Sequence, residues 1–210
     1  MWFACAIIPR VSFPTSSSRP WGLALTLIIT GILGWLASLM LILDKIALLQ
    51  DPNSALNCNF SLLVQCGRSL GSWQGSIFFG VPNPIWGLGA FAVPIVVGVA
   101  LFAGARFAAW FWRGLALGVT AGMVWVIWFI YESIFVLGTL CPWCMTMWAG
   151  MIPLFWVLVL FTLKSGAVPM PERARRAATE VYAWSWVIVT LNFLVVIVLA
   201  QLRLDAFSYL

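Results

Sequence analysis

Five stretches of the chain consist almost entirely of apolar residues, and shorter polar or Gly/Pro-containing segments separate them. They cover roughly residues 21–43, 84–104, 111–131, 142–163 and 182–202. At about 1.5 Å per residue, each is long enough to cross about 30 Å of hydrocarbon as an α-helix. The pattern therefore predicts an all-α integral membrane protein with five transmembrane helices.

The composition supports the membrane assignment and excludes several kinds of chemistry. Hydrophobic residues make up 63% of the 210 residues and charged residues only 8%, whereas a soluble domain carries about 25% charge. The chain has no histidine, which excludes histidine ligands to haem or zinc and catalytic Ser-His-Asp or Cys-His units. The net charge of +5 does not indicate nucleic acid binding, because the basic residues flank the apolar segments.

The distribution of lysine and arginine predicts the orientation in the membrane. With the N-terminus in the cytosol, the outer segments hold three basic residues and the cytosolic segments hold eight. The outer ones are Lys45, Arg68 and Arg203; the cytosolic ones are Arg10, Arg19, Arg106, Arg113, Lys164, Arg173, Arg175 and Arg176. Cytosolic segments are normally the richer in lysine and arginine. We therefore expect a cytosolic N-terminus and an external C-terminus.

These spans divide the chain into four parts. Residues 1–20 form a cytosolic tail, whose Cys5 we expect to be incidental, and residues 21–163 form a four-helix bundle with an outer loop at 50–83. Residues 164–181 form a basic cytosolic loop, and residues 182–210 form the fifth helix and an outer tail. Glycines recur in the first four apolar segments, notably Gly114, Gly118 and Gly122 on one face of the third. Small residues allow helices to approach closely in lipid, so we expect these four helices to pack together with the fifth at the edge.

The sequence Cys141-Pro142-Trp143-Cys144 opens the fourth apolar segment. In a helix, positions i and i+3 share one face at about 5 Å, which suits a disulfide. Pro142 falls at about the first helical position, where its missing N–H costs nothing, and a helix N-terminus favours a thiolate. The pattern predicts a redox-active pair; the alternative is two buried cysteines that act as small hydrophobic residues.

The outer loop carries a second pair, Cys58 and Cys66. The predicted topology places all four of these cysteines on the oxidising outer side, where disulfides persist, and this favours the redox interpretation. A straight helix would hold Cys58 and Cys66 about 12 Å apart along its axis, too far for a disulfide. Either the chain between them bends and they pair with each other, or Cys66 pairs elsewhere.

The ordered set of motifs resembles the bacterial branch of the vitamin K epoxide reductase (VKOR) family over residues 21–163. The matching pieces are residues 58–66 (CNFSLLVQC), residues 71–84 (GSWQGSIFFGVPNP) and residues 141–144 (CPWC). In quinone-linked oxidases of the DsbB type the CxxC lies in the first outer loop, which is the reverse of the order here. The resemblance implies a four-transmembrane-helix bundle around a quinone site, with the fifth helix peripheral.

The resemblance also implies roles for the cysteines. Cys144 would be the thiolate that contacts the quinone, and Cys141 would exchange with the loop. Cys58 and Cys66 would be the shuttle pair, and Cys66 would form the transient disulfide with Cys141.

The resemblance also suggests what the residues at three further positions do. Ser72 matches a hydroxyl near the active-site cysteines, and Asn83 matches an asparagine that hydrogen-bonds a quinone carbonyl. Animal members have a tyrosine where this chain has Trp148, which argues against vitamin K epoxide chemistry and leaves quinone reduction intact. The expected cofactor is a quinone of the menaquinone or ubiquinone class.

The expected function is that of a quinone-linked thiol oxidoreductase with its active site on the outer side of a bacterial plasma membrane. It would reoxidise an extracytoplasmic thioredoxin-fold partner of the DsbA type and so support disulfide formation. Many bacterial members carry a thioredoxin-like domain after the fifth helix; this sequence stops at Leu210, so we expect a separate partner and a monomeric membrane protein. The alternatives are a reductase of vitamin K quinone or epoxide, a zinc site built from the four cysteines, and a structural or transporter component.

Quinone reduction consumes protons, and a chain without histidine must obtain them elsewhere. Water, Ser72 or a carboxylate near the outer face are the candidates. Asp44 and Glu132 lie near the outer ends of the first and third helices. We expect both to be solvated or paired charges without a catalytic role.

Overall fold

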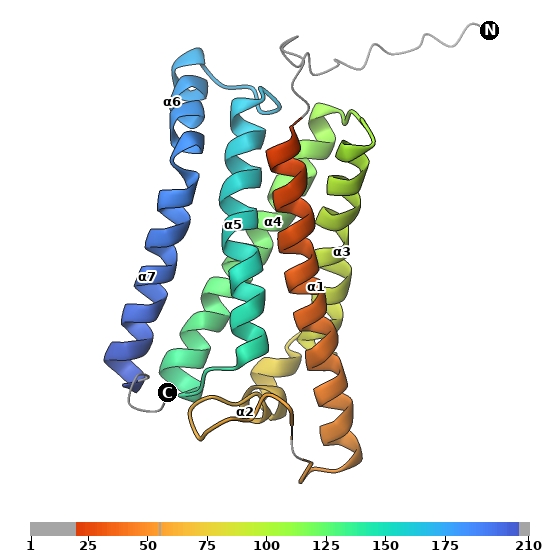
Figure 1. Cartoon of the computed structure of the whole chain (residues 1–210), viewed down its shortest axis with the longest axis vertical. Coiled ribbons are helices and arrows are strands. Elements are labelled where there is room, and N and C mark those ends of the chain that lie inside the picture. The colour runs from red at the N-terminus through yellow and green to blue at the C-terminus, as the bar shows by residue number, and fades with distance from the viewer. Residues whose placement is uncertain (1–19, 55, 206–210) are drawn as a thin grey trace, which may run out of the picture.

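The computed structural model describes residues 20–54 and 56–205, and these are mostly helical, with a long non-helical loop between Gln50 and Gly67 (Figure 1). The expected cytosolic tail, with Cys5, lies almost wholly outside the described residues, as does the end of the outer tail. The elements, in chain order, are α1 (Trp21–Gln50), α2 (Gly67–Gly71), the 3-10 helix η1 (Trp73–Ser76), α3 (Asn83–Phe102), α4 (Ala109–Tyr131), the π-helix η2 (Glu132–Leu137), α5 (Pro142–Lys164), α6 (Glu172–Ala183) and α7 (Ser185–Leu204).

Five of these elements are long and apolar enough to cross a membrane, which confirms the five predicted spans. They are α1, α3, α4 with η2, α5 and α7. The largest boundary difference is in α1, which continues seven residues beyond the predicted end at Leu43. A charged pair such as Asp44 and Lys45 ends an apolar segment but does not end a helix, because both residues are compatible with helical backbone.

The bundle is organised around α1 and α5, which pack against each other. α3 packs on α1, and α4 packs on α5. Gly98 of α3 and Gly150 of α5 permit this close approach, since a Cβ at either would lie 2.8 Å from a carbonyl oxygen of α1. The glycine argument fails for α4: Gly114 and Gly118 face open space, and only Gly122 meets a neighbour, Met151.

The fifth span, α7, lies at the edge of the bundle as expected (Figure 1). Ala200 is its only buried residue. Between α7, α4 and α5 runs an apolar groove of about 350 Å³, lined by residues such as Ile127, Ile152 and Val195. The rest of the α7 surface consists mainly of exposed leucine, valine and isoleucine side chains. This composition suits a helix face that contacts lipid, and α7 has no glycines for close packing on another helix.

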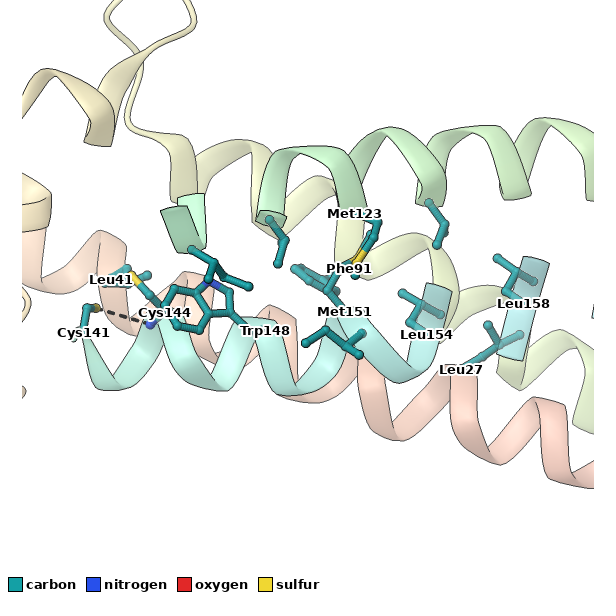
Figure 2. Packing of buried hydrophobic residues seen from close by; sticks show 14 of the residues in the cluster. Leu27, Leu41, Phe91, Met123, Cys141, Cys144, Trp148, Met151, Leu154 and Leu158 are labelled. Atoms are coloured by element: carbon teal, nitrogen blue, oxygen red, sulfur yellow. Dashed lines mark hydrogen bonds between the residues drawn. The ribbon is translucent and has the colours of Figure 1, made fainter. Parts of the chain in front are cut away.

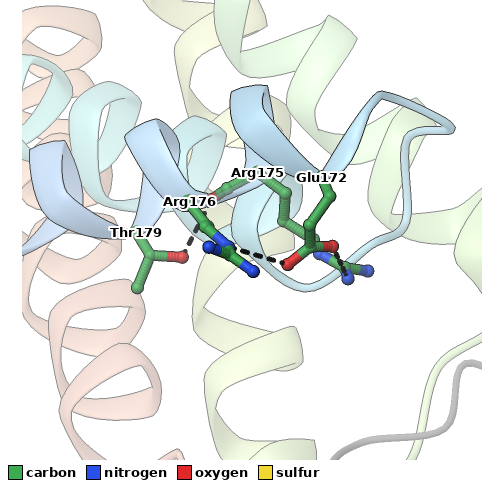
Figure 3. Close-up of polar contacts among 4 residues, drawn as sticks. All are labelled: Glu172, Arg175, Arg176 and Thr179. Carbon is green, nitrogen blue, oxygen red and sulfur yellow. Dashed lines mark hydrogen bonds and ion pairs between the residues drawn. The ribbon is translucent and has the colours of Figure 1, made fainter.

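The segment expected to be a basic cytosolic loop contains a helix, α6. Its polar face is held together by Glu172, which pairs with Arg175 and Arg176, and by the Thr179 hydroxyl, which donates to the Arg175 carbonyl (Figure 3). Opposite charges three or four residues apart support a helix. The sequence predicts a loop here because the segment is rich in charged residues.

The two ends of the bundle differ in character (Figure 1). At one end lie α6 and the start of α1. At the other lie α2, the loop between α1 and α3, and the start of α5. The cysteine motifs and the basic helix α6 are therefore at opposite ends.

Candidate active site

The CxxC pair stands at the N-terminus of α5, where the sequence predicts it. Cys141 is the N-cap residue, with extended backbone, and Pro142 follows at the first turn of the helix. The Cys144 amide N–H donates to Cys141 Sγ over 3.3 Å (Figure 2). The sulfur of Cys141 therefore takes the place of a capping oxygen. Both thiols are buried and unpaired.

Cys144 lies one turn further into the helix and belongs to the apolar interior. It shares a buried cluster with Leu41 of α1 and Trp148 of α5 (Figure 2). Only 6% of Cys144 is exposed. Cys144 and Trp148 are four residues apart and therefore share a helix face.

The loop cysteines are joined to each other: Cys58 and Cys66 form a disulfide with a Cα–Cα distance of 5.7 Å. Of the two arrangements left open by the sequence, the bent chain is the one found. The bend is a tight turn in which the amides of Phe60 and Ser61 donate to the Val64 carbonyl. The Asn59 side chain then accepts from the amides of Cys66, at 3.0 Å, and Gly67, at 3.3 Å.

An isolated parallel β-bridge brings the loop pair to the helix pair. Val64 pairs with Leu140, through bonds from the Gln65 amide to the Leu140 carbonyl and from the Leu140 amide to the Leu63 carbonyl. The bridge sets Cys66 beside Cys141, and their Sγ atoms lie 3.2 Å apart. Both cysteines are 0% exposed. Thiol–disulfide exchange requires a sulfur to reach a disulfide sulfur, and this arrangement meets that requirement.

These sulfur positions make the zinc alternative a poor fit. A closed zinc site would need thiolates from all four cysteines. The Cys58–Cys66 disulfide uses two of them.

Comparison with known families agrees with this geometry. Residues 25–159 match the vitamin K epoxide reductase family. The chain belongs to this family. A search of curated proteins gave no match.

Members of the vitamin K epoxide reductase family couple thiols to a quinone and generally work with a thioredoxin-like protein. The chain is therefore a multi-pass membrane oxidoreductase of the disulfide and quinone kind. The family match ends at residue 159, before α6 and α7, which accords with the peripheral position of α7.

Asn83, expected at a quinone carbonyl, is the first residue of α3 and also braces the preceding loop. Its Nδ2 donates to the Gln74 carbonyl over 2.6 Å, and its Oδ1 accepts from the Ile77 amide over 3.2 Å. An amide group has two N–H donors. One of them is committed to Gln74, so the other can serve a ligand.

Ser72, expected near the active-site cysteines, lies between α2 and η1. Its hydroxyl donates to the Ser69 carbonyl over 2.9 Å. This bond occupies the only proton that the side chain can give. The contacts of Ser72 thus tie α2 to η1, and its expected role near the cysteines stays a prediction.

The two acids were expected to be solvated or paired charges, but both are buried and neither belongs to an ion pair among the described residues. Asp44 is 8% exposed and Glu132 is 9% exposed. The Glu132 carboxylate accepts from the side chain of Gln74 over 3.2 Å, and Gln74 is the residue whose carbonyl binds Asn83. Glu132 is therefore connected to Asn83 through a single buried glutamine.

Asp44 lies against the loop disulfide. Its Oδ2 is 3.1 Å from Cys58 Sγ, whereas the neighbouring Lys45 turns away and donates to the Leu70 carbonyl at the end of α2. Neither of the ion pairs found among the described residues involves Asp44.

Sequence reasoning missed Asn59 and Gln74 and undervalued Asp44 and Glu132. The available signal was an acid at the end of an otherwise apolar helix, which in a membrane protein is costly enough to suggest a function. Nothing in the spacing of Asn59 or Gln74 indicated their partners. Their contacts, which include the side-chain bond from Gln74 to Glu132, exist only after the loop has folded.

Proposed function

We propose that this protein is a disulfide-generating thiol oxidase that passes electrons from an extracytoplasmic thioredoxin-fold dithiol, of the DsbA type, to a membrane quinone. The outer pair, Cys58 and Cys66, takes the electrons first. Cys66 then forms a mixed disulfide with Cys141, and Cys144 leaves. The catalytic end of the bundle faces the periplasmic side of a bacterial plasma membrane, and the basic helix α6 faces the cytosol.

The observation that carries this function is the 3.2 Å separation of Cys66 Sγ and Cys141 Sγ, with one pair oxidised and the other reduced. This is the arrangement reached after the loop pair has given its electrons to Cys141 and Cys144. Because the sulfurs already touch, exchange between the pairs needs no large movement of the bundle.

The residues around Cys144 suit a quinone, which would supply a two-electron, two-proton acceptor of the menaquinone or ubiquinone class. Cys144 presents its thiol inside an apolar cluster that contains Trp148. Asn83 has an N–H free of the Gln74 bond and can donate it to a carbonyl oxygen. Glu132, linked to Asn83 through Gln74, is the nearest connected acid, and we assign it the supply of protons to this site in place of Ser72.

The experiment uses the full chain in liposomes that contain a quinone, with a reduced thioredoxin-fold dithiol protein as electron donor. Quinone reduction is followed by its absorbance. Activity should be lost in Cys141→Ala and Cys144→Ala, and lost or strongly reduced in Cys58→Ala and Cys66→Ala. Cys5→Ala is the matched control and should have wild-type activity.

The same variants test the order of the relay. Cys66→Ala should accumulate a mixed disulfide between Cys58 and the donor protein, visible on a non-reducing gel. Wild-type turnover in Cys144→Ala would refute its proposed contact with the quinone. Wild-type protein that fails to oxidise any thioredoxin-fold dithiol would refute the function as a whole.

A further inference from the structure

Within residues 20–54 and 56–205, one acidic side chain contacts a sulfur of the two cysteine pairs, namely Asp44 at Cys58. Asp44 Oδ2 and Cys58 Sγ are 3.1 Å apart, and both residues are buried. In the disulfide state Cys58 carries no thiol proton. A hydrogen bond across this gap must then be donated by the carboxyl group of Asp44, with the sulfur as a weak acceptor.

When the loop disulfide is reduced, the donor and the acceptor of this hydrogen bond change places. Cys58 then carries a thiol that can donate, and Asp44 as a carboxylate can accept. The same two atoms therefore hold one proton in both redox states, on oxygen in one and on sulfur in the other.

The surroundings leave Asp44 available for this exchange. Lys45 on the same helix is bound to the Leu70 carbonyl. From the loop, the titratable group that faces Asp44 is Cys58, with Cys66 joined to it and Cys141 lying behind Cys66. Burial excludes bulk water, which would otherwise compete for the proton.

We propose that Asp44 is a catalytic acid and base that exchanges a proton with Cys58 each time the loop disulfide opens and closes. The role rests on the proposed relay. In the closing step, Asp44 takes the thiol proton as Cys58 Sγ attacks Cys66 Sγ of the Cys66–Cys141 mixed disulfide. The Cys58–Cys66 bond forms, the Cys66–Cys141 bond breaks, and Cys141 leaves as a thiolate with the bonding electron pair.

In the opening step the proton returns. One thiolate of the thioredoxin-fold donor attacks Cys58 Sγ, the Cys58–Cys66 bond breaks, and Cys66 leaves as a thiolate. The second donor thiolate then attacks the donor sulfur bound to Cys58, so that the donor becomes a disulfide and its two thiol protons pass to water. Cys58 is released as a thiolate, and Asp44 protonates it. Each cycle thus returns Asp44 to its starting state: the electrons pass on to Cys141, and the proton stays between Asp44 and Cys58.

The first test measures where the proton resides. Infrared difference spectra are recorded between the oxidised and reduced loop pair in a Cys141→Ser, Cys144→Ser background, so that only Cys58 and Cys66 change redox state. A carboxylic acid C=O band should be present in the oxidised form and lost on reduction. The band should be absent in Asp44→Asn, shifted in Asp44→Glu and unchanged in Asp51→Asn, a control at an exposed acid at the end of the same helix. No carboxyl signal on reduction would overturn the proposal.

The second test measures turnover with the quinone and the dithiol donor. Asp44→Asn keeps the size of the side chain and should lower turnover at pH 7 about 100-fold, the usual scale of acid–base catalysis. The loss should shrink as the pH is raised, because hydroxide replaces the missing base, and the Cys66–Cys141 mixed disulfide should accumulate. Asp44→Glu should recover much of the activity.

The outcomes separate this role from the function on which it rests. An inactive wild-type protein would refute the relay. An active wild-type protein with equal turnover in Asp44→Asn, or with a loss that is the same at every pH, would overturn only the role of Asp44.

Discussion

The two cysteine pairs, to which the proposed relay gives the same exchange chemistry, are held by very different supports. Cys141 and Cys144 are fixed by a helix whose N-terminus, proline and capping bond all act locally. Cys58 and Cys66 are held by a tight turn, one asparagine side chain and a single β-bridge. The first pair is built into a long helix of the bundle, and the second is held by a few contacts of the outer loop.

This difference in support suits the different roles of the two pairs in the proposed relay. The helix pair must face the membrane interior and can stay there. The loop pair must meet both Cys141 and an external protein, yet Cys58 is only 1% exposed, so the segment has to open to be reduced. Exposed apolar residues at its surface, such as Phe60, Leu62 and Trp73, offer a face for the membrane interface or for the donor protein.

We have proposed one buried acid for each half of the relay, and the two differ in their contacts. Asp44 touches a sulfur directly, whereas Glu132 is connected to the quinone side only through Gln74 and Asn83. If the two acids serve different half-reactions, removing one should leave the other half-reaction intact.

Glu132→Gln tests whether the two acids serve different half-reactions. Glutamine keeps the size of the side chain and can still accept from Gln74, but it cannot release a proton. We expect quinone-dependent turnover to fall about 100-fold, while exchange between the donor dithiol and the loop pair stays within about twofold. Stopped-flow measurement of each half-reaction separates the two. Equal slowing of both would mean that Glu132 supports the fold and not the proton supply.

The parts of this molecule that sequence reasoning predicted correctly depend on short-range rules. Five apolar segments of sufficient length gave five helices, and Pro142 beside Cys141 gave the capped start of α5. Order along the chain also sufficed to recognise the family, since the loop pair precedes the CxxC.

The parts it missed depend on contacts between distant residues. Asp44 and Cys58 are 14 positions apart, and Cys66 and Cys141 are 75 apart. Which acid meets which sulfur is decided by how the loop folds back over α1. Likewise the glycine pattern of α4 resembled a packing face, but Gly114 and Gly118 face open space, because α4 is buried through larger side chains such as Trp112, Val119 and Met123.

Gly150→Ala tests how closely α5, the helix that carries Cys141 and Cys144, packs on α1. The new Cβ would lie 2.8 Å from the Thr30 carbonyl oxygen of α1, and backbone cannot yield as a flexible side chain would. We expect a loss of about 2 kcal/mol in the free energy of unfolding, typical of overpacking, measured by thermal unfolding in detergent. Gly118→Ala is the matched control: it meets no neighbour and should unfold at the wild-type temperature or slightly above. Equal effects would contradict the close α1–α5 contact.

Asn59→Ala tests the loop that holds Cys58 and Cys66, and it should have the smallest effect of these substitutions. It removes the acceptor for the Cys66 and Gly67 amides, a loss of about 1 kcal/mol, which corresponds to about fivefold in the ratio of open to closed loop. Limited proteolysis within residues 59–66, which requires the open loop, should speed up by about that factor, and exchange between Cys66 and Cys141 should slow by at most that factor. Global unfolding should not change, because the bundle does not depend on this bond. Asn59→Asp keeps the acceptor oxygen and should retain most of the exchange rate. If Asn59→Ala instead lowered the unfolding temperature as much as Gly150→Ala does, the loop pair would have to be regarded as part of the scaffold.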